Sequence, residues 1–174
     1  MIAKKYRTTI KWVLYTAFAL LLFLLQCAPQ RLGIFSDVLF MMPFAIAVSC
    51  YEKIIPSAII ASLCGLFWDY SAQRAFGFHA LFMCIICVAV SLLMKFYVRP
   101  VYVSAAAAVS AAVLIYCLVD FFFFYALRSY ENIGSLFASD YLPTFFKTCV
   151  FGLGILYVVE KIYRISPQRA KFDE

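Results

Sequence analysis

The amino-acid sequence predicts an all-α integral membrane protein, built as a single bundle of six transmembrane helices. Of its 174 residues, 66% are hydrophobic and only 14% are charged, whereas an average soluble domain is roughly 45–50% apolar. So few polar side chains cannot cover a water-facing surface, and lipid must therefore contact much of the exterior. Because each span takes about 20 residues, six helices use most of the chain. Residues 1–174 then form one membrane domain, with no room for a soluble catalytic domain.

Six apolar runs follow one another along the chain. The first run lies behind a basic N-terminus, and its apolar core is long for a cleavable secretory signal, so we expect a retained helix. The second and third runs are short and meet at a turn that contains Glu52, Lys53 and Pro56. The predicted helices span approximately residues 12–28, 35–51, 54–69, 78–97, 101–127 and 141–163. Aromatic residues near the predicted ends, among them Tyr15, Trp68 and Tyr141, are expected to anchor the helices at the membrane interfaces.

Basic residues are divided unequally between the two predicted faces of the membrane. Basic loops stay in the cytoplasm, so the richer face, which holds both termini, is predicted to be cytoplasmic. The formal net charge of +6 then favours contact with the lipid bilayer and its anionic headgroups, and no nucleic-acid partner is expected, because the basic residues flank apolar runs and form no stripe. The richer face carries Lys4, Lys5, Arg7, Lys11, Lys53, Lys95, Arg99, Lys161, Arg164, Arg169 and Lys171, and the other carries Arg31, Arg74, Arg128 and Lys147.

Enzyme motifs are missing from the sequence. His79 is the single histidine, and no nucleophile or second carboxylate accompanies it at a catalytic spacing. Cys84 and Cys87 have the spacing of a redox or zinc motif, but they lie in an apolar run without a basic neighbour that would stabilise a thiolate. We therefore predict a protein that is not an enzyme and has no catalytic residue, metal site or cofactor.

A stripe of residues spaced by four ends the third predicted helix. It consists of Ala61, Gly65 and Asp69. The two small residues would let a neighbouring helix approach closely, and the carboxylate would emerge at the end of the stripe. Two interpretations stay open for Asp69. It could be a polar latch that belongs to a packing seam, or it could simply end the helix at the headgroup boundary, where a carboxylate costs little.

A second stripe of small residues lies in the first half of the fifth predicted helix. It is formed by Ser104, Ala108 and Ala112, accompanied by Ala107 and Ala111. Such residues allow two helix backbones to come close together. Internal packing is the favoured interpretation, because a bundle of six helices needs several such seams, and contact with a partner protein is the alternative.

Asp120 needs a partner, because it lies well inside the fifth predicted helix, roughly 10 Å deep at 1.5 Å per residue. An unpaired carboxylate at that depth costs several kcal/mol or takes up a proton. Lys147 lies a few residues into the sixth predicted helix, across a short loop. We therefore predict that Asp120 and Lys147 form an intramembrane pair. A proton or ion relay would require a chain of acidic residues through the bilayer, which the sequence does not contain.

Two short segments resemble MreD, the family of rod shape-determining membrane proteins. They are Gly65-Leu66-Phe67-Trp68-Asp69 and Gly77-Phe78-His79-Ala80-Leu81. The layout of the whole chain is similar to this family, and the similarity is specific over about residues 43–81. The positions that fit the family are Pro43, Gly65, Asp69, Gly77, Ala80 and Leu81.

The resemblance implies a scaffold in the bacterial cell membrane, within the machinery of cell elongation and lateral peptidoglycan synthesis. It implies an MreC-like bitopic membrane protein as the partner and, through it, an MreB-like filament and the wall synthases. The residues carried over, with a structural or partner-binding role, are Gly65 and Asp69. Gly77 belongs to the same motif.

Substrate-binding subunits of energy-coupling-factor vitamin transporters are the alternative family, since they have a similar length and number of helices. Those subunits dock through two alanines spaced by four on their first helix, but here Leu21 stands four residues after Ala17. A vitamin pocket also needs several convergent polar groups. The candidates for such groups are few: Asp69, Arg74, His79 and Arg128.

Overall fold

The computed structural model describes residues 2–27, 38–72, 77–98, 101–124 and 137–165, and every regular element within these ranges is a helix. Four helices are long and apolar enough to cross a membrane, which confirms an all-α membrane protein at the level of fold class. The elements are α1 (Ile2–Cys27), α2 (Met41–Tyr51), α3 (Ile54–Ala72), α4 (Phe78–Phe96), α5 (Tyr102–Phe124), the short π-helical turn η4 (Phe137–Tyr141) and α7 (Leu142–Arg164). The predicted loop residues Arg31, Arg74, Arg99 and Arg128, and the terminal Arg169 and Lys171, lie outside the described ranges.

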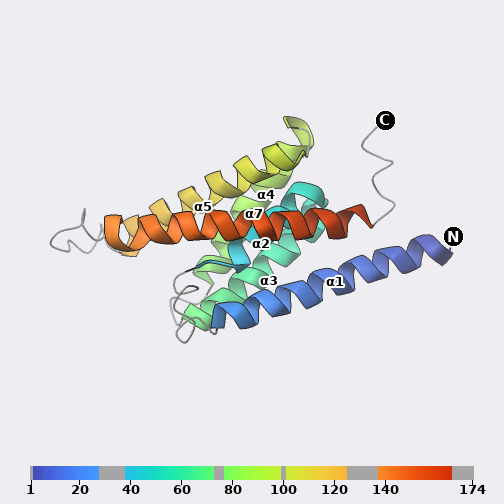
Figure 1. Cartoon of the computed structure of the whole chain (residues 1–174), viewed down its shortest axis with the longest axis horizontal. Coiled ribbons are helices and arrows are strands. Elements are labelled where there is room, and N and C mark those ends of the chain that lie inside the picture. The colour runs from blue at the N-terminus through green and yellow to red at the C-terminus, as the bar shows by residue number, and fades with distance from the viewer. Residues whose placement is uncertain (1, 28–37, 73–76, 99–100, 125–136, 166–174) are drawn as a thin grey trace.

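Helices α1, α5 and α7 extend roughly along the long axis of the molecule, and α4 crosses it obliquely (Figure 1). Helix α1 begins and α7 ends at the same end, which is named here the terminal end. Helix α5 ends at the other end, named the opposite end, where it meets η4 and the start of α7. Neighbouring long helices that follow each other in sequence therefore run in opposite directions.

Helix α2 is the centre of the bundle. All eleven of its residues are buried, and it packs against α1, α3, α4, α5 and α7. A helix that is apolar on every side belongs in a protein interior. At 1.5 Å per residue it is about 16 Å long, roughly half the thickness of a bilayer core. The predicted span over residues 35–51 is thus corrected: within the described chain, only Met41–Tyr51 is helical in that region.

Two glycines mark where helices approach most closely. A methyl group built on Gly65 of α3 would lie 2.3 Å from the Cα of Ala80 in α4, so the two backbones touch there. On the other side of the core, a methyl group on Gly152 of α7 would lie 3.2 Å from Pro43 of α2 and 3.3 Å from Val109 of α5. The first contact is the tighter one, since its obstacle is backbone and cannot rotate away.

Candidate functional site

The carboxylate of Asp69, at the end of α3, caps the start of α4. Its Oδ2 accepts hydrogen bonds from the backbone N–H of Gly77 at 2.9 Å and of Ala80 at 3.3 Å, and its Oδ1 accepts one from the N–H of His79 at 3.1 Å. The first N–H groups of a helix have no acceptor within the helix, and the helix dipole there favours a negative charge. Because the residue is only 2% exposed, this geometry corresponds to a polar latch between two helices.

Gly77 gives the chain the shape that this cap requires. Its φ of +94° lies in the left-handed region, which residues that carry a Cβ rarely adopt. No atom lies within 4 Å of a Cβ placed on Gly77. The requirement for glycine is therefore one of backbone conformation, whereas the requirement at Gly65 is one of space.

His79 extends the latch towards α5. Its Nδ1 lies 2.6 Å from Oδ1 of Asp69 and its Nε2 lies 3.0 Å from the hydroxyl of Tyr116. The indole of Trp68 stacks on the imidazole, with ring centroids 4.9 Å apart and planes 13° apart. A neutral imidazole protonated at Nδ1 donates to Asp69 and accepts from Tyr116, whereas an imidazolium donates to both.

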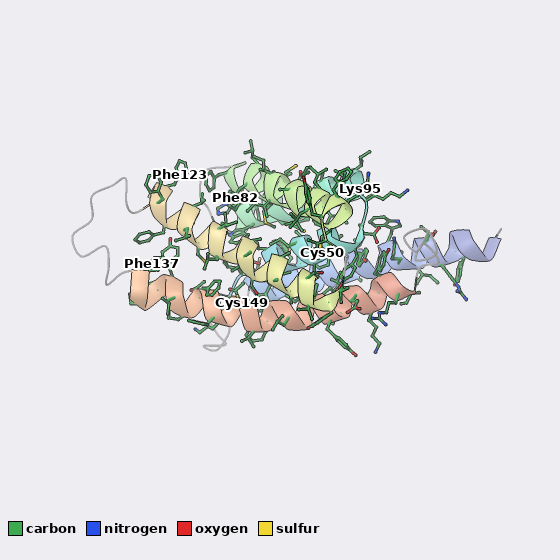
Figure 2. All side chains as sticks on the ribbon, turned by 90° about the horizontal axis from the view of Figure 1, so that it is seen from above. Cys50, Phe82, Lys95, Phe123, Phe137 and Cys149 are labelled. Carbon is green, nitrogen blue, oxygen red and sulfur yellow. The ribbon has the colours of Figure 1, made fainter. Side chains whose placement is uncertain are left out.

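Asp120 of α5 continues the same network. Its Oδ1 lies 3.4 Å from the Tyr116 hydroxyl, and its Oδ2 accepts a hydrogen bond of 2.6 Å from the hydroxyl of Tyr141, the last residue of η4. Asp69, His79, Tyr116 and Asp120 are each at most 5% exposed. One buried chain of hydrogen bonds, named here the polar network, thus connects α3, α4, α5 and η4. Figure 2 shows the labelled Phe123 of α5 and Phe137 of η4 at the same end of the molecule.

The structure does not bring Asp120 and Lys147 together. Among the described residues, no ion pair joins them, and Lys147 is half-buried on α7. The physical reason is helix register. Tyr141 reaches the level of Asp120, and Lys147 lies six residues further along, about 9 Å at 1.5 Å per residue.

Three aromatic residues of this region have roles that sequence reasoning missed. Trp68 and Tyr141 are predicted to lie at the interfaces, and the structure adds that Trp68 stacks on His79 and that Tyr141 donates a hydrogen bond to Asp120. Tyr116 was not singled out at all. Its spacing of four from Asp120 on one helix was the available signal, because residues spaced by four share a helix face.

The seam predicted on α5 is only partly internal. Ala112 is buried, Ser104 and Ala108 are half-buried, and the accompanying Ala107 and Ala111 are exposed. The hydroxyl of Ser104 bonds to the backbone of Val101 at the start of the helix. The buried stripe is displaced by about one residue and contains Ala105, Val109, Ala112, Tyr116 and Asp120. On α3, by contrast, Ala61 is fully buried.

A second polar contact joins α1 to the core near the terminal end. The Nζ of Lys11 lies 2.7 Å from Oε1 of Glu52, and the two side chains are 1% and 3% exposed. The hydroxyl of Tyr15 lies 3.4 Å from the same oxygen. Lys11 was counted from the sequence as one of the basic residues that flank the first helix. Its partner comes from a turn 41 residues away, which no local pattern reveals.

The described chain holds no group of three or more His, Cys, Asp or Glu side chains placed to bind a metal ion. Three cavities lie between described residues, with volumes of about 420, 290 and 220 Å³, and neither Asp69 nor His79 lines any of the three. The polar network is therefore best described by what it does within the molecule. It satisfies buried polar groups with one another and fixes the junction of four elements.

Together, the fold and this site define a class: an all-helical membrane protein whose buried polar groups at one end bind chiefly to each other. Comparison with family models, with curated proteins and with solved structures finds no match for the chain.

Proposed function

We propose that the protein is a non-enzymatic scaffold of the bacterial cell-elongation machinery, similar in role to MreD. In this proposal it crosses the cell membrane six times with both termini in the cytoplasm. It binds an MreC-like bitopic protein and, through it, an MreB-like filament and wall synthases.

One observation carries the proposal: the residues of the family-like motif meet at a single junction. Gly65 touches the backbone of Ala80, and Asp69 accepts hydrogen bonds from Gly77 and Ala80. The motif thus encodes the packing of α3 against α4. These motif residues hold two helices together, and none of their polar groups remains available to bind a substrate. Such an arrangement suits a scaffold.

The polar groups also support a scaffold over a vitamin-binding subunit. A small-molecule site has a few polar groups that point into a cavity. Here Asp69 is bonded to His79, which is bonded in turn to Tyr116, and the three described cavities are lined by other residues. The arrangement favours fixed helices over a ligand pocket.

The surface proposed for the bitopic partner lies on α5. The seam on α3 is occupied by α4, because Gly65 and Ala80 are in contact. On α5, Ala107 and Ala111 are exposed and Ser104 and Ala108 are half-buried, so a second helix can still approach this face. Small residues at such spacing allow close contact between membrane helices without a hydrophobic driving force.

Co-purification tests this surface. The full chain is extracted in mild detergent, and the captured membrane proteins are identified by mass spectrometry. The double variant Ala107→Leu and Ala111→Leu is expected to fold and to lose at least about tenfold of the captured bitopic partner, since bulky side chains prevent close helix contact.

Ala17→Leu, at an exposed position of α1, is the matched control and should capture as much partner as the wild type. Equal capture by the α5 double variant would refute this surface. Capture of an ATPase module, or a bound vitamin, in place of a bitopic partner would refute the scaffold itself.

A further inference from the structure

A cavity with a volume of about 420 Å³ lies at the terminal end. It is bounded by the turn between α2 and α3 and by the last turns of α4. The cavity exists because α2 is short: it ends at Tyr51, and the chain turns back at Glu52 and Lys53. Helix α4 continues to Phe96, and Figure 2 shows the labelled Cys50 and Lys95 in this region.

The charge of the cavity is positive. Lys53 and Lys95, from two different elements, both line it, and both are exposed. Neither lysine forms an ion pair within the described chain, and Nζ of Lys95 lies 5.2 Å from the ring centre of Phe96. The one carboxylate of the cavity, Glu52, is neutralised by Lys11 at 2.7 Å. The two lysines are therefore available to an anion.

The start of α3 adds hydrogen-bond donors to the same wall. The first intrahelical bond runs from the N–H of Ser57 to the carbonyl of Lys53, so the N–H groups of Ile54 and Ile55 have no acceptor within the helix. Helix N-termini favour negative charge, as phosphate sites show. Tyr51 also lines the cavity, and its hydroxyl is the one buried side-chain polar atom without a hydrogen-bond partner in the described chain.

The rest of the cavity wall is apolar. It is formed chiefly by Ile54, Ile55, Pro56 and Met94. The hydroxyls of Ser49 and Ser91, which also line the cavity, are already used in hydrogen bonds with Ser57 and with backbone carbonyls. A cationic rim above an apolar wall matches a molecule with an anionic head and a hydrocarbon tail.

We propose that this cavity binds an acidic phospholipid, with its headgroup phosphate between Lys53, Lys95 and the start of α3. An acyl chain then covers the apolar wall beside Ile55 and Met94. Each basic residue near a membrane surface raises the affinity for an anionic lipid by about fivefold. This inference does not depend on the scaffold function, because the cavity lies at the end of the bundle away from the polar network.

The test measures lipid binding by the full chain, purified in a neutral detergent. Phosphatidylglycerol, phosphatidylcholine and inorganic phosphate are titrated separately, and binding is followed by native mass spectrometry and by the thermal midpoint. Wild type is expected to prefer phosphatidylglycerol. The double variant Lys53→Gln and Lys95→Gln should bind it roughly thirtyfold more weakly, since two lysines are lost.

Two controls distinguish lipid binding at this cavity from a general effect of positive charge on the protein. Lys161→Gln removes an exposed lysine of α7 that does not line the cavity, and the double variant Lys53→Arg and Lys95→Arg keeps both charges. Both should bind within about twofold of wild type, because the local charge is unchanged. The Gln variant without lipid should keep the thermal midpoint of the wild type.

Three results would overturn the proposal. The first is equal affinity for the two lipids, and the second is a loss of lipid affinity in Lys161→Gln as large as in the double Gln variant. The third is a loss of lipid binding in the double Arg variant. Protection by inorganic phosphate as strong as that by the acidic lipid, and lost in the Gln variant, would keep the anion site but assign it to free phosphate. Protection by the acidic lipid alone assigns it to the membrane.

Discussion

Among the described residues, the buried charges have partners around them. Asp69 accepts three backbone hydrogen bonds and faces His79, and Glu52 is bonded to Lys11 and Tyr15. The two arrangements differ in what they hold. The cap at Asp69 fixes the start of one helix, whereas the pair at Glu52 ties α1 to a turn far away in sequence. In both, the loss of one member leaves the other buried without its partner, which costs more than the contact itself contributed.

At the residue scale, Asp69→Asn should destabilise the protein by about 2–3 kcal/mol, because one carboxylate oxygen becomes an amide that cannot accept from N–H groups. The measurement is the midpoint of unfolding in a detergent titration. Asp140→Asn is the control, since Asp140 is exposed and its carboxylate bonds only to the neighbouring Ser139 among the described contacts. A loss of stability in the control equal to that of Asp69→Asn would contradict the role of the cap.

Two helices of this bundle are held by close backbone contact as well as by apolar side chains. The contact between α3 and α4 depends on the missing side chain of Gly65, whereas Gly152 of α7 lies against the side chains of Pro43 and Val109. In lipid, where apolar surface gains little from burial against another helix, such close packing supplies much of the association energy.

At the element scale, Gly65→Ala should destabilise the protein by about 3 kcal/mol, because the new methyl group would lie 2.3 Å from the Cα of Ala80 and must push α3 and α4 apart. Gly154→Ala on α7 is the matched control. No atom lies within 4 Å of its added methyl group, so it should be neutral or stabilise the helix by up to about 1 kcal/mol. Thermal midpoints in detergent distinguish these outcomes, and similar shifts for the two variants would exclude a special role for Gly65.

Particular elements show how much of this fold can be predicted from the sequence alone. The apolar runs located each α-helix of the described ranges, because hydropathy is a property of each segment by itself. The start of α2 at Met41 was missed, since an apolar run contains residues before the helix begins as well as within it. The partners of Asp120 were missed because Tyr116 and Tyr141 meet it only through the register of three elements. Pairings of that kind depend on packing and have no local signature.

The whole molecule is asymmetric along its long axis. The opposite end contains the polar network, and the terminal end contains the Lys11–Glu52 pair and the cavity with Lys53 and Lys95. Of the described basic residues, Lys53, Lys95, Lys161 and Arg164 follow or end helices that point to the terminal end, whereas Lys147 lies near the start of α7. The proposed orientation rests on this excess of basic residues at the terminal end.

At the scale of the whole molecule, the proposed topology makes a direct prediction. A reporter fused before residue 1 or after residue 174 should stay in the cytoplasm, because the basic residues retain that face. A reporter inserted within residues 125–136, between α5 and η4, should be exported. Export of either terminal fusion would reverse the proposed orientation, and retention of all three would contradict the number of crossings.

The complete burial of α2 has a consequence for how the protein is made. A segment that shows no face to lipid and is about 16 Å long gains little from entering the bilayer alone. Its neighbours on every side come from both earlier and later parts of the chain, the last of them being α7. During synthesis, α2 therefore reaches its final surroundings only once α7 has been inserted, so this core is completed after the helices that precede α7.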